Sequence, residues 1–236
     1  MVQVSIIRLI GYREWTESLG FDREHAIQEV QGNLHRELSR IFSQYGAFAH
    51  PLRYDYMIAI TNGMSVEDHK KVIEYLKRIS PVPIAIGIAC NEIPLIAEKK
   101  ASQLAISAKP WEVVKQNSEC NCKFVTIAHA DIVNSTSLTI SKSSYEVYSY
   151  VELMYRRFKK LSMKMGGITL YLGGDNMLSI LGNNVDIKSL RMFSKKYCVR
   201  IGIGISINAR KALTLAAKAL HEMRSRNLID VLVIND

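Results

Sequence analysis

The chain has 236 residues, of which 48% are hydrophobic and 22% are charged. This composition provides a sizeable buried core and excludes an intrinsically disordered chain. The formal charge of +9 suits an anionic partner, although a solvated basic surface would give the same count. Because the sequence shows no aromatic RNA-binding motif, we expect a small phosphorylated ligand and no nucleic acid.

The sequence also argues against a membrane protein and a secreted protein. No apolar run approaches the roughly 20 residues that span a bilayer. Residues 1–15, MVQVSIIRLIGYREW, contain neither a basic leader nor a small-residue cleavage site, so we expect a cytoplasmic protein without a signal. Cys120 and Cys122 form a CxC without a nearby histidine cluster, which is a weak zinc signal. We expect these cysteines, with Cys90 and Cys198, to be reduced thiols.

The first half of the chain predicts strands and helices in alternation. Residues 21–45 have Ile27, Leu34 and Leu38 at helical spacing, which indicates an amphipathic helix. Ser65 and Asp68 form a capping box that starts a second helix. The predicted elements are a strand over 2–10, a helix over 21–45, a hairpin over 47–63, a helix over 65–80, a strand over 81–90 and a helix over 94–108.

The second half predicts the same succession of elements. The segment RYDYMIAITNG in the first half corresponds to GGDNMLSILGN in the second, and PVPIAIGIAC corresponds to CVRIGIGISI. The offset is roughly 120 residues, about half the chain, which indicates a duplication. The predicted elements are a strand over 124–132, a helix over 145–165, a hairpin over 166–183, a helix over 186–197, a strand over 199–207, a helix over 209–226 and a strand over 228–236.

A βαββαβ succession is the ferredoxin-like arrangement. We therefore expect an α+β fold of two tandem duplicated ferredoxin-like units, each an antiparallel sheet with helices packed on one face. The N-terminal repeat should cover residues 1–112 and the C-terminal repeat residues 122–236. The join falls in residues 109–122, a polar segment with little periodicity.

Two carboxylates in the second half indicate a metal site. Asp131 lies near the end of the first strand, and Asp175 lies in the hairpin that neighbours this strand in a ferredoxin-like sheet. Two acids at adjacent strand ends suit Mg²⁺, which keeps waters and often binds substrate phosphates as well. The backbone carbonyl of Ile132 is a further candidate ligand. Each acid alone also has a structural interpretation, since GGDN is a common hairpin turn and Asp131 also fits a helix cap or turn.

The residues around these acids suggest a binding site for a nucleotide. The loop after Asp131 is small and polar, and its N–H groups and hydroxyls suit phosphate oxygens. Gly173 and Gly174 would let a nucleotide or a metal-bound water approach the strand. The candidate ligand-binding residues are Asn134, Ser135, Thr136, Gly173, Gly174 and Asn176.

Two further residues are candidates for proton transfer. His129 alternates with Asp131 along the strand and would share its face, although such a histidine is more often packed or solvated. Asp55 is the counterpart of Asp175 in the first half. Aligning the repeats places Ile10 opposite Asp131, so the first half would retain one acid of the pair. We expect this half to support the site or bind the base.

At these residues the sequence resembles archaeal GTP cyclohydrolase III over nearly the whole chain. The resemblance rests on GYREWTESLG, RYDYMIAITNG, HADIVNST, GGDN and IGIGIS, and it is most specific where GGDN and HADI occur at the repeat spacing. The family is similar in fold to the palm of class III nucleotidyl cyclases and GGDEF-type diguanylate cyclases, which place two acids around Mg²⁺. The sequence departs from the family at Ile10, Gly11, Tyr56, Ala130 and Val133.

The resemblance implies a reaction and a set of partners. GTP would be opened at carbon 8 of the guanine with the formyl group retained and the triphosphate cleaved, giving a 2-amino-5-formylamino-6-ribosylamino-pyrimidinone 5′-phosphate and two phosphates, for flavin and deazaflavin pathways. We expect Mg²⁺ at two ions per site, GTP as the ligand, no membrane partner and a homo-oligomer. Ring opening needs a second metal or a general base, for which His129 and Asp55 are the candidates.

Two other functions stay open at this point. A nucleotidyl or diguanylate cyclase would use the same bound GTP, but the turn reads GGDNM and lacks the second acid of the GGDEF group. A non-catalytic nucleotide sensor would suit the loss of an acid in the first half. The products formed from GTP separate these functions.

Overall fold

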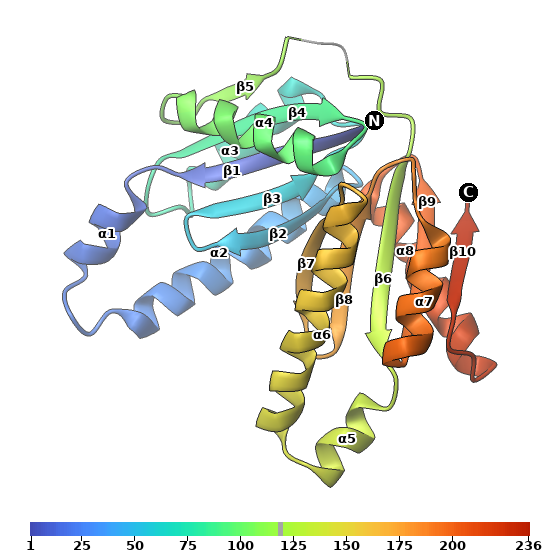
Figure 1. The fold of residues 1–236 in the computed structure, drawn as a ribbon. Coiled ribbons are helices and arrows are strands. Elements are labelled where there is room, and N and C mark those ends of the chain that lie inside the picture. Colours follow the sequence, from blue (N-terminus) through green and yellow to red (C-terminus); the bar gives the residue numbers. More distant parts are fainter. Residues whose placement is uncertain (118–119) are drawn as a thin grey trace. The chain divides into compact units, whose positions relative to one another are not determined.

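The computed structural model describes residues 1–117 and 120–236, which form two compact units. Unit 1 comprises Met1–Asn91 and Ile96–Lys123, and unit 2 comprises Glu92–Leu95 and Phe124–Asp236. Each unit contains a five-stranded sheet with helices on it (Figure 1). The duplicated α+β fold expected from the sequence is therefore confirmed.

The sheet of unit 1 has the strand order β2-β3-β1-β4-β5. Strand β1 pairs antiparallel with both β3 and β4, and β5 pairs parallel with β4. This unit contains β1 (Val2–Leu9), α1 (Tyr12–Ser18), α2 (Glu24–Gln44), β2 (Phe48–Arg53), β3 (Tyr56–Ile60), α3 (Val66–Leu76), β4 (Ile84–Asn91), α4 (Pro94–Ser107) and β5 (Val113–Lys115).

The sheet of unit 2 has the corresponding order, β10-β9-β6-β8-β7. Strand β6 pairs antiparallel with β8 and β9, and β10 pairs parallel with β9. This unit contains β6 (Val125–Ile132), α5 (Ser135–Ser141), α6 (Ser144–Lys164), β7 (Ile168–Gly173), β8 (Asn176–Leu181), α7 (Ile187–Tyr197), β9 (Val199–Ser206), α8 (Ala209–Ser225) and β10 (Val231–Asn235).

Helices cover both faces of each sheet. In unit 2, Ile201 and Ile203 of β9 belong to a core with α6 and α7, whereas Gly202 and Gly204 point the other way. A Cβ at Gly204 would lie 1.9 Å from the carbonyl oxygen of Ala212, so glycine lets α8 pack directly on the strand. Gly87 of β4 has the same relation to Ala101 of α4.

The ferredoxin-like core is thus extended by two helices and one strand in each unit: α1, α4 and β5 in unit 1, and α5, α8 and β10 in unit 2. The expectation of helices on one face holds for α2 and α3, and for α6 and α7. It does not hold for α4 and α8, which pack on the opposite face and lead to the extra parallel strands β5 and β10. Strand β5 lies in the polar segment that we interpreted as the join between the repeats.

The cysteines differ from the expectation of free thiols. Cys90 at the end of β4 forms a disulfide with Cys120, and the two residues are 30 positions apart in the sequence. Cys122 and Cys198 are free. The prediction of reduced thiols is therefore wrong for one pair, because a spacing pattern does not show that the chain returns to β4 beyond β5.

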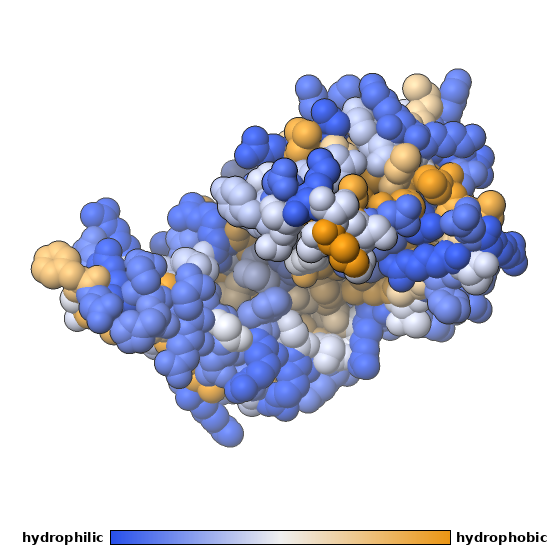
Figure 2. All heavy atoms as spheres, turned by 90° about the horizontal axis from the view of Figure 1, so that it is seen from below, coloured by the Kyte–Doolittle hydropathy of each residue, from blue (hydrophilic) through white to orange (hydrophobic). Residues whose placement is uncertain are grey.

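Figure 2 shows that hydrophilic residues cover most of the face seen there, with hydrophobic residues in small groups. Within residues 1–117 and 120–236, no helix combines the length and the apolar character that crossing a membrane requires.

Candidate functional site

The turn between β7 and β8 has a backbone that requires glycine. Gly173 has a φ of 100° and Gly174 a φ of 58°, in the left-handed region that other residues seldom adopt. The Tyr171 hydroxyl donates a hydrogen bond to the Gly174 carbonyl at 2.8 Å and holds this turn. A Cβ at Gly173 would meet no atom within 4 Å, so backbone conformation alone explains this glycine. The idea that it clears space for a ligand stays a prediction.

Asp175 follows these glycines and lies in a chain of hydrogen bonds. Its carboxylate accepts from the hydroxyl of Ser135, which begins α5, and from the side-chain amide of Asn176 at 2.9 Å. The Asn176 carbonyl oxygen lies 3.0 Å from Nε2 of His129. The structure therefore joins four of the residues predicted from the sequence, His129, Asn176, Asp175 and Ser135, in one continuous network.

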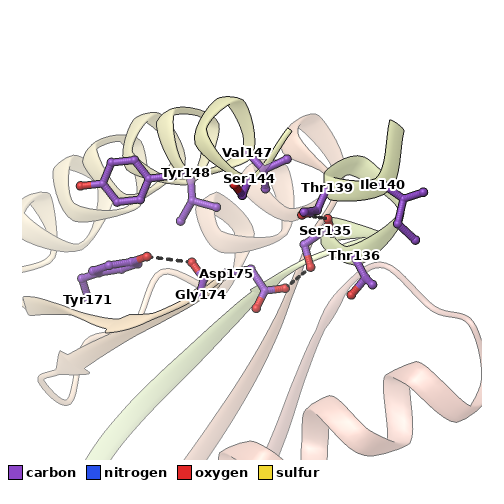
Figure 3. Close-up of a pocket in the computed structure, with 11 residues that line it drawn as sticks. Ser135, Thr136, Thr139, Ile140, Ser144, Val147, Tyr148, Tyr171, Gly174 and Asp175 are labelled. Atoms are coloured by element: carbon purple, nitrogen blue, oxygen red, sulfur yellow. Dashed lines mark hydrogen bonds between the residues drawn. The ribbon is translucent and has the colours of Figure 1, made fainter. Parts of the chain in front are cut away.

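A cavity of about 430 Å³ opens beside Asp175, between the hairpin and the helices α5 and α6 (Figure 3). This volume lies within the range of small-molecule sites. Tyr171 on the strand and Tyr148 on α6 provide aromatic walls (Figure 3). The remaining lining residues are mostly hydroxyl-bearing or aliphatic: Ser135, Thr136, Thr139, Ile140, Ser144, Val147, Val151 and Gly174.

Asp131 lies on the other side of the sheet. His129 and Asp131 project from β6 toward α8, because Ala128 and Ala130 belong to the core formed with α6 and α7. Asp131 is only 5% exposed, and its carboxylate accepts two hydrogen bonds from Arg224 of α8, at 2.7 Å from Nη2 and 3.3 Å from Nε. Asp131 lies near the end of β6, as the sequence predicted, but it is buried and paired with an arginine.

A second arginine lies near the same carboxylate. Nη1 of Arg200, on the neighbouring strand β9, is 3.9 Å from Oδ2 of Asp131. Arg200 is also buried, at 8% exposure, and its Nε donates to the carbonyl of Leu228 at 2.9 Å. Asp131 therefore faces two guanidinium groups. The three side chains together carry a net charge of +1.

The carboxylates still fit a divalent cation chemically. Asp131 is the register partner of Asn176, the residue after Asp175, so the two acids are near neighbours along the hairpin end of the sheet. Both offer the hard oxygen ligands that Mg²⁺ takes. Within the described residues, no group of three or more His, Cys, Asp and Glu side chains is placed to hold a metal. A cation here would need backbone, water or phosphate oxygens as well.

Burial affects the protonation of His129. Desolvation is the main cause that lowers the pKa of this histidine, and the hydrogen bond to Asn176 partly opposes the shift. His129 is therefore neutral at pH 7 and retains a nitrogen that can accept a proton. This state suits the predicted role in proton transfer.

The other predicted residues lie near the pocket or in the core. Asn134 has a left-handed φ of 59° just before α5 and makes no side-chain capping bond. Thr136 lines the cavity. The Ile132 side chain is buried in the core, so only its backbone is a candidate for a ligand.

Unit 1 has a different set of residues at the equivalent positions. Arg8 pairs with Tyr56 and Ala85, as Asp131 pairs with Asn176 and Arg200. The counterpart of Asp131 is therefore Arg8, and the alignment with Ile10 is wrong by two residues.

Asp55, the counterpart of Asp175, is bound by a neighbouring arginine. Its carboxylate accepts from Arg53 at 3.0 Å. Arg8 stands where unit 2 has an acid, and Arg53 neutralises Asp55. At the equivalent strand end, unit 1 therefore has a single carboxylate, and an arginine already binds it.

Sequence reasoning missed four residues of this region. Arg200 and Arg224 join Asp131 from separate elements, and Arg224 is 93 positions away in the sequence. Tyr148 and Tyr171 were assigned to a helix and a strand without a role in the site. A basic residue near the end of the last helix was the available signal for Arg224, but nothing local tied it to Asp131.

The fold and the site define a class of duplicated α+β proteins with a small-molecule cavity in the C-terminal unit. The sequence profile of the family described as GTP cyclohydrolase III matches residues 2–236. The chain belongs to this family.

Curated relatives with the name GTP cyclohydrolase III match the chain along its length. The protein of Aeropyrum pernix is 35% identical over 226 residues, covering 95% of this chain and 93% of the relative. The protein of Pyrobaculum arsenaticum is 36% identical over 234 residues, covering 99% of this chain and all of the relative. The protein of Pyrobaculum calidifontis is 34% identical over 236 residues.

Solved structures are more distantly similar. A bacterial light-regulated adenylyl cyclase aligns with 99% of this chain and 85% of its own, at 11% identity and a TM-score of 0.41. An EAL/GGDEF domain protein of M. capsulatus covers 49% of this chain and 87% of its own, at 17% identity and a TM-score of 0.40. Scores at this level indicate nothing about activity.

Proposed function

We propose that this protein is a GTP cyclohydrolase III. One water opens the bond between carbon 8 and N9 of guanine and leaves carbon 8 as the formyl group. Two further waters cleave the phosphoanhydride bonds and release two phosphates. The product is 2-amino-5-formylamino-6-ribosylamino-4(3H)-pyrimidinone 5′-phosphate.

The observation that carries this proposal is the cavity beside Asp175, in a chain that belongs to the family. The two tyrosines, Tyr148 and Tyr171, suit a planar base, because base–aromatic stacking stabilises bound nucleotides. Hydroxyls of Ser135, Thr139 and Ser144 donate and accept hydrogen bonds, as the edge of guanine requires. We propose that the base occupies this cavity.

The triphosphate would then extend toward the end of β6. The loop that contains Asn134, Ser135 and Thr136 follows this strand, and Gly174 leaves the hairpin side open. Arg224 and Arg200 supply the excess positive charge at the same strand end. Anionic phosphates are attracted by such a charge.

Asp131, Asp175 and the carbonyl of Ile132 would hold Mg²⁺. When bound, this ion neutralises phosphate charge and makes a bound water more acidic. His129 is neutral and half-buried, and it can accept a proton during ring opening. Asp55 is the weaker candidate for this role, because Arg53 neutralises its carboxylate.

Product analysis tests this function. We expect incubation with GTP and Mg²⁺ to give the ring-opened monophosphate with the formyl group retained, together with two phosphates, as measured by mass spectrometry. Asp175→Asn should remove this product. A cyclic or dinucleotide product would assign the protein to the cyclases, and unchanged GTP would point to a sensor. The expected homo-oligomer stays a prediction, which light scattering measures.

A further inference from the structure

Arg224 and Arg200 hold Asp131 in different ways. Arg200 is anchored by the Leu228 carbonyl, and its side chain is only 10% exposed. The Arg224 side chain is 49% exposed, and both hydrogen bonds of its guanidinium in the described residues go to Asp131. Arg224 can therefore leave the carboxylate by rotating its side chain into solvent, whereas Arg200 cannot.

The two bonds from Arg224 use both oxygens of Asp131. Oδ1 accepts from Nη2 at 2.7 Å, and Oδ2 accepts from Nε at 3.3 Å. A divalent cation needs lone pairs of the same oxygens, and it would repel a guanidinium at that distance. Arg224 and a cation therefore compete for the carboxylate of Asp131.

We propose that Arg224 occupies the position of the divalent cation at Asp131 and is displaced when that cation binds. This inference rests on the proposed function, because it concerns the metal site of that function. Arg224 keeps the nearly buried carboxylate paired before the ion arrives. The released guanidinium then lies beside the same strand end and can pair with the phosphates of the nucleotide. Cation and nucleotide therefore bind cooperatively, since the nucleotide replaces the partner that Arg224 loses.

Metal titration without nucleotide tests the displacement directly. We expect Arg224→Gln to bind Mn²⁺ about fivefold more tightly than the unchanged protein, as measured from the electron paramagnetic resonance signal of free Mn²⁺. This factor corresponds to about 1 kcal/mol, the order of a half-exposed ion pair. Arg224→Lys keeps the charge but loses the two-pronged geometry, so its affinity should lie between the two.

Two control variants separate this effect from general electrostatics. Arg226→Gln removes one positive charge from the C-terminal cap of the same helix, where no ion pair with Asp131 is found. It should change Mn²⁺ affinity by less than about twofold. Asp131→Asn in the Arg224→Gln background should abolish the gain.

The cooperativity gives a second readout. A non-hydrolysable GTP analogue should tighten Mn²⁺ binding in the unchanged protein, and this coupling should fall in Arg224→Gln. Mn²⁺ should also raise the melting temperature of Arg224→Gln more than that of the unchanged protein, since the ion replaces the partner that the Asp131 carboxylate has lost. This measurement covers the case in which the variant is less stable.

The outcomes separate the two proposals. Equal or weaker Mn²⁺ affinity in Arg224→Gln, or no Mn²⁺ binding by any variant, overturns the displacement of Arg224 even where GTP is still opened. Absence of ring opening by the unchanged protein overturns the proposed function, whatever the metal affinities show.

Discussion

Asp131→Asn tests whether the ion cluster on the α8 side of the sheet stabilises unit 2. The asparagine keeps a hydrogen-bond acceptor but loses the charge that faces two arginines. The pair with Arg224 is half-exposed and contributes about 1 kcal/mol. Arg200 is buried, but at 3.9 Å it is beyond hydrogen-bond distance, so its loss of a counter-charge costs about 1–2 kcal/mol, less than a tight buried pair.

The expected loss is therefore about 2–3 kcal/mol of unfolding free energy. For a chain of this size, this lowers the melting temperature by about 5–10 °C. Urea unfolding and thermal denaturation followed by circular dichroism measure both quantities. A melting temperature equal to that of the unchanged protein would refute the view that the cluster contributes to stability.

Asp175→Asn is the matched control. Its carboxylate accepts from a hydroxyl and an amide and has no ion pair in the described residues, so the same substitution should cost less than about 1 kcal/mol. Under the proposed function both variants lose turnover. The comparison thus separates the contribution of a carboxylate to folding from its contribution to chemistry.

Asp55→Asn should retain more turnover than Asp175→Asn, as measured by steady-state kinetics. The reason is that Arg53 already binds Asp55 and that Arg8 stands where unit 2 has Asp131. An equally inactive Asp55 variant with normal GTP binding would show that unit 1 carries chemistry. Burial lowers the pKa values of His69 and His129, so the folded state binds fewer protons than the unfolded state. Thermal stability should therefore fall as the pH drops from about 7 through about 6.5, the pKa of histidine in the unfolded chain. Melting temperatures that do not change between pH 7.5 and 5.5 would contradict this. Cys90→Ser should lower the unfolding free energy by up to about 3.6 kcal/mol, the loop entropy of a 30-residue separation, and a reductant should produce the same loss in thermal melts only in the unchanged protein. Gly204→Ala should destabilise the protein by about 3 kcal/mol, because the added Cβ would overlap the Ala212 carbonyl. Gly32→Ala in α2 adds a Cβ that meets no atom within 4 Å, and it should stabilise the protein by about 0.5–1 kcal/mol. Urea unfolding of the two variants measures these opposite changes.

Local patterns in the sequence predicted the long elements well. The capping box of Ser65 and Asp68 is present at the start of α3, and the periodic segments form α2 and α6 close to their expected bounds. Short elements were missed for a physical reason. Strand β5 has three residues and exists because β4 offers it a free edge, which is information from tertiary structure.

The alignment of the repeats failed at β1 because of the period of a strand. Side chains alternate with a period of two, so a shift by one residue exchanges the faces and is easily recognised. A shift by two residues keeps the same faces and the same hydrophobic pattern. The sequence VQVSIIRLI therefore gave no reason to prefer Arg8 over Ile10 as the counterpart of Asp131, and only the register with β3 and β4 distinguishes them.

This correction changes the interpretation of the duplication. Residues 1–123 contain 15 Lys and Arg against 14 Asp and Glu, whereas residues 124–236 contain 16 against 8. Nearly all of the net positive charge therefore lies in residues 124–236, which form most of unit 2. At the equivalent strand position, however, the charges are reversed, with Arg8 in the neutral unit and Asp131 in the basic one. In the basic unit, Asp131 pairs with Arg200 and Arg224 at the end of the strand that leads to the cavity. An arginine at the same place in unit 1 repels a cation and leaves Asp55 to a neighbouring guanidinium. The two halves thus share strand order and register but not electrostatics, and this difference is the physical reason why we propose unit 2, and not unit 1, as the place of the chemistry.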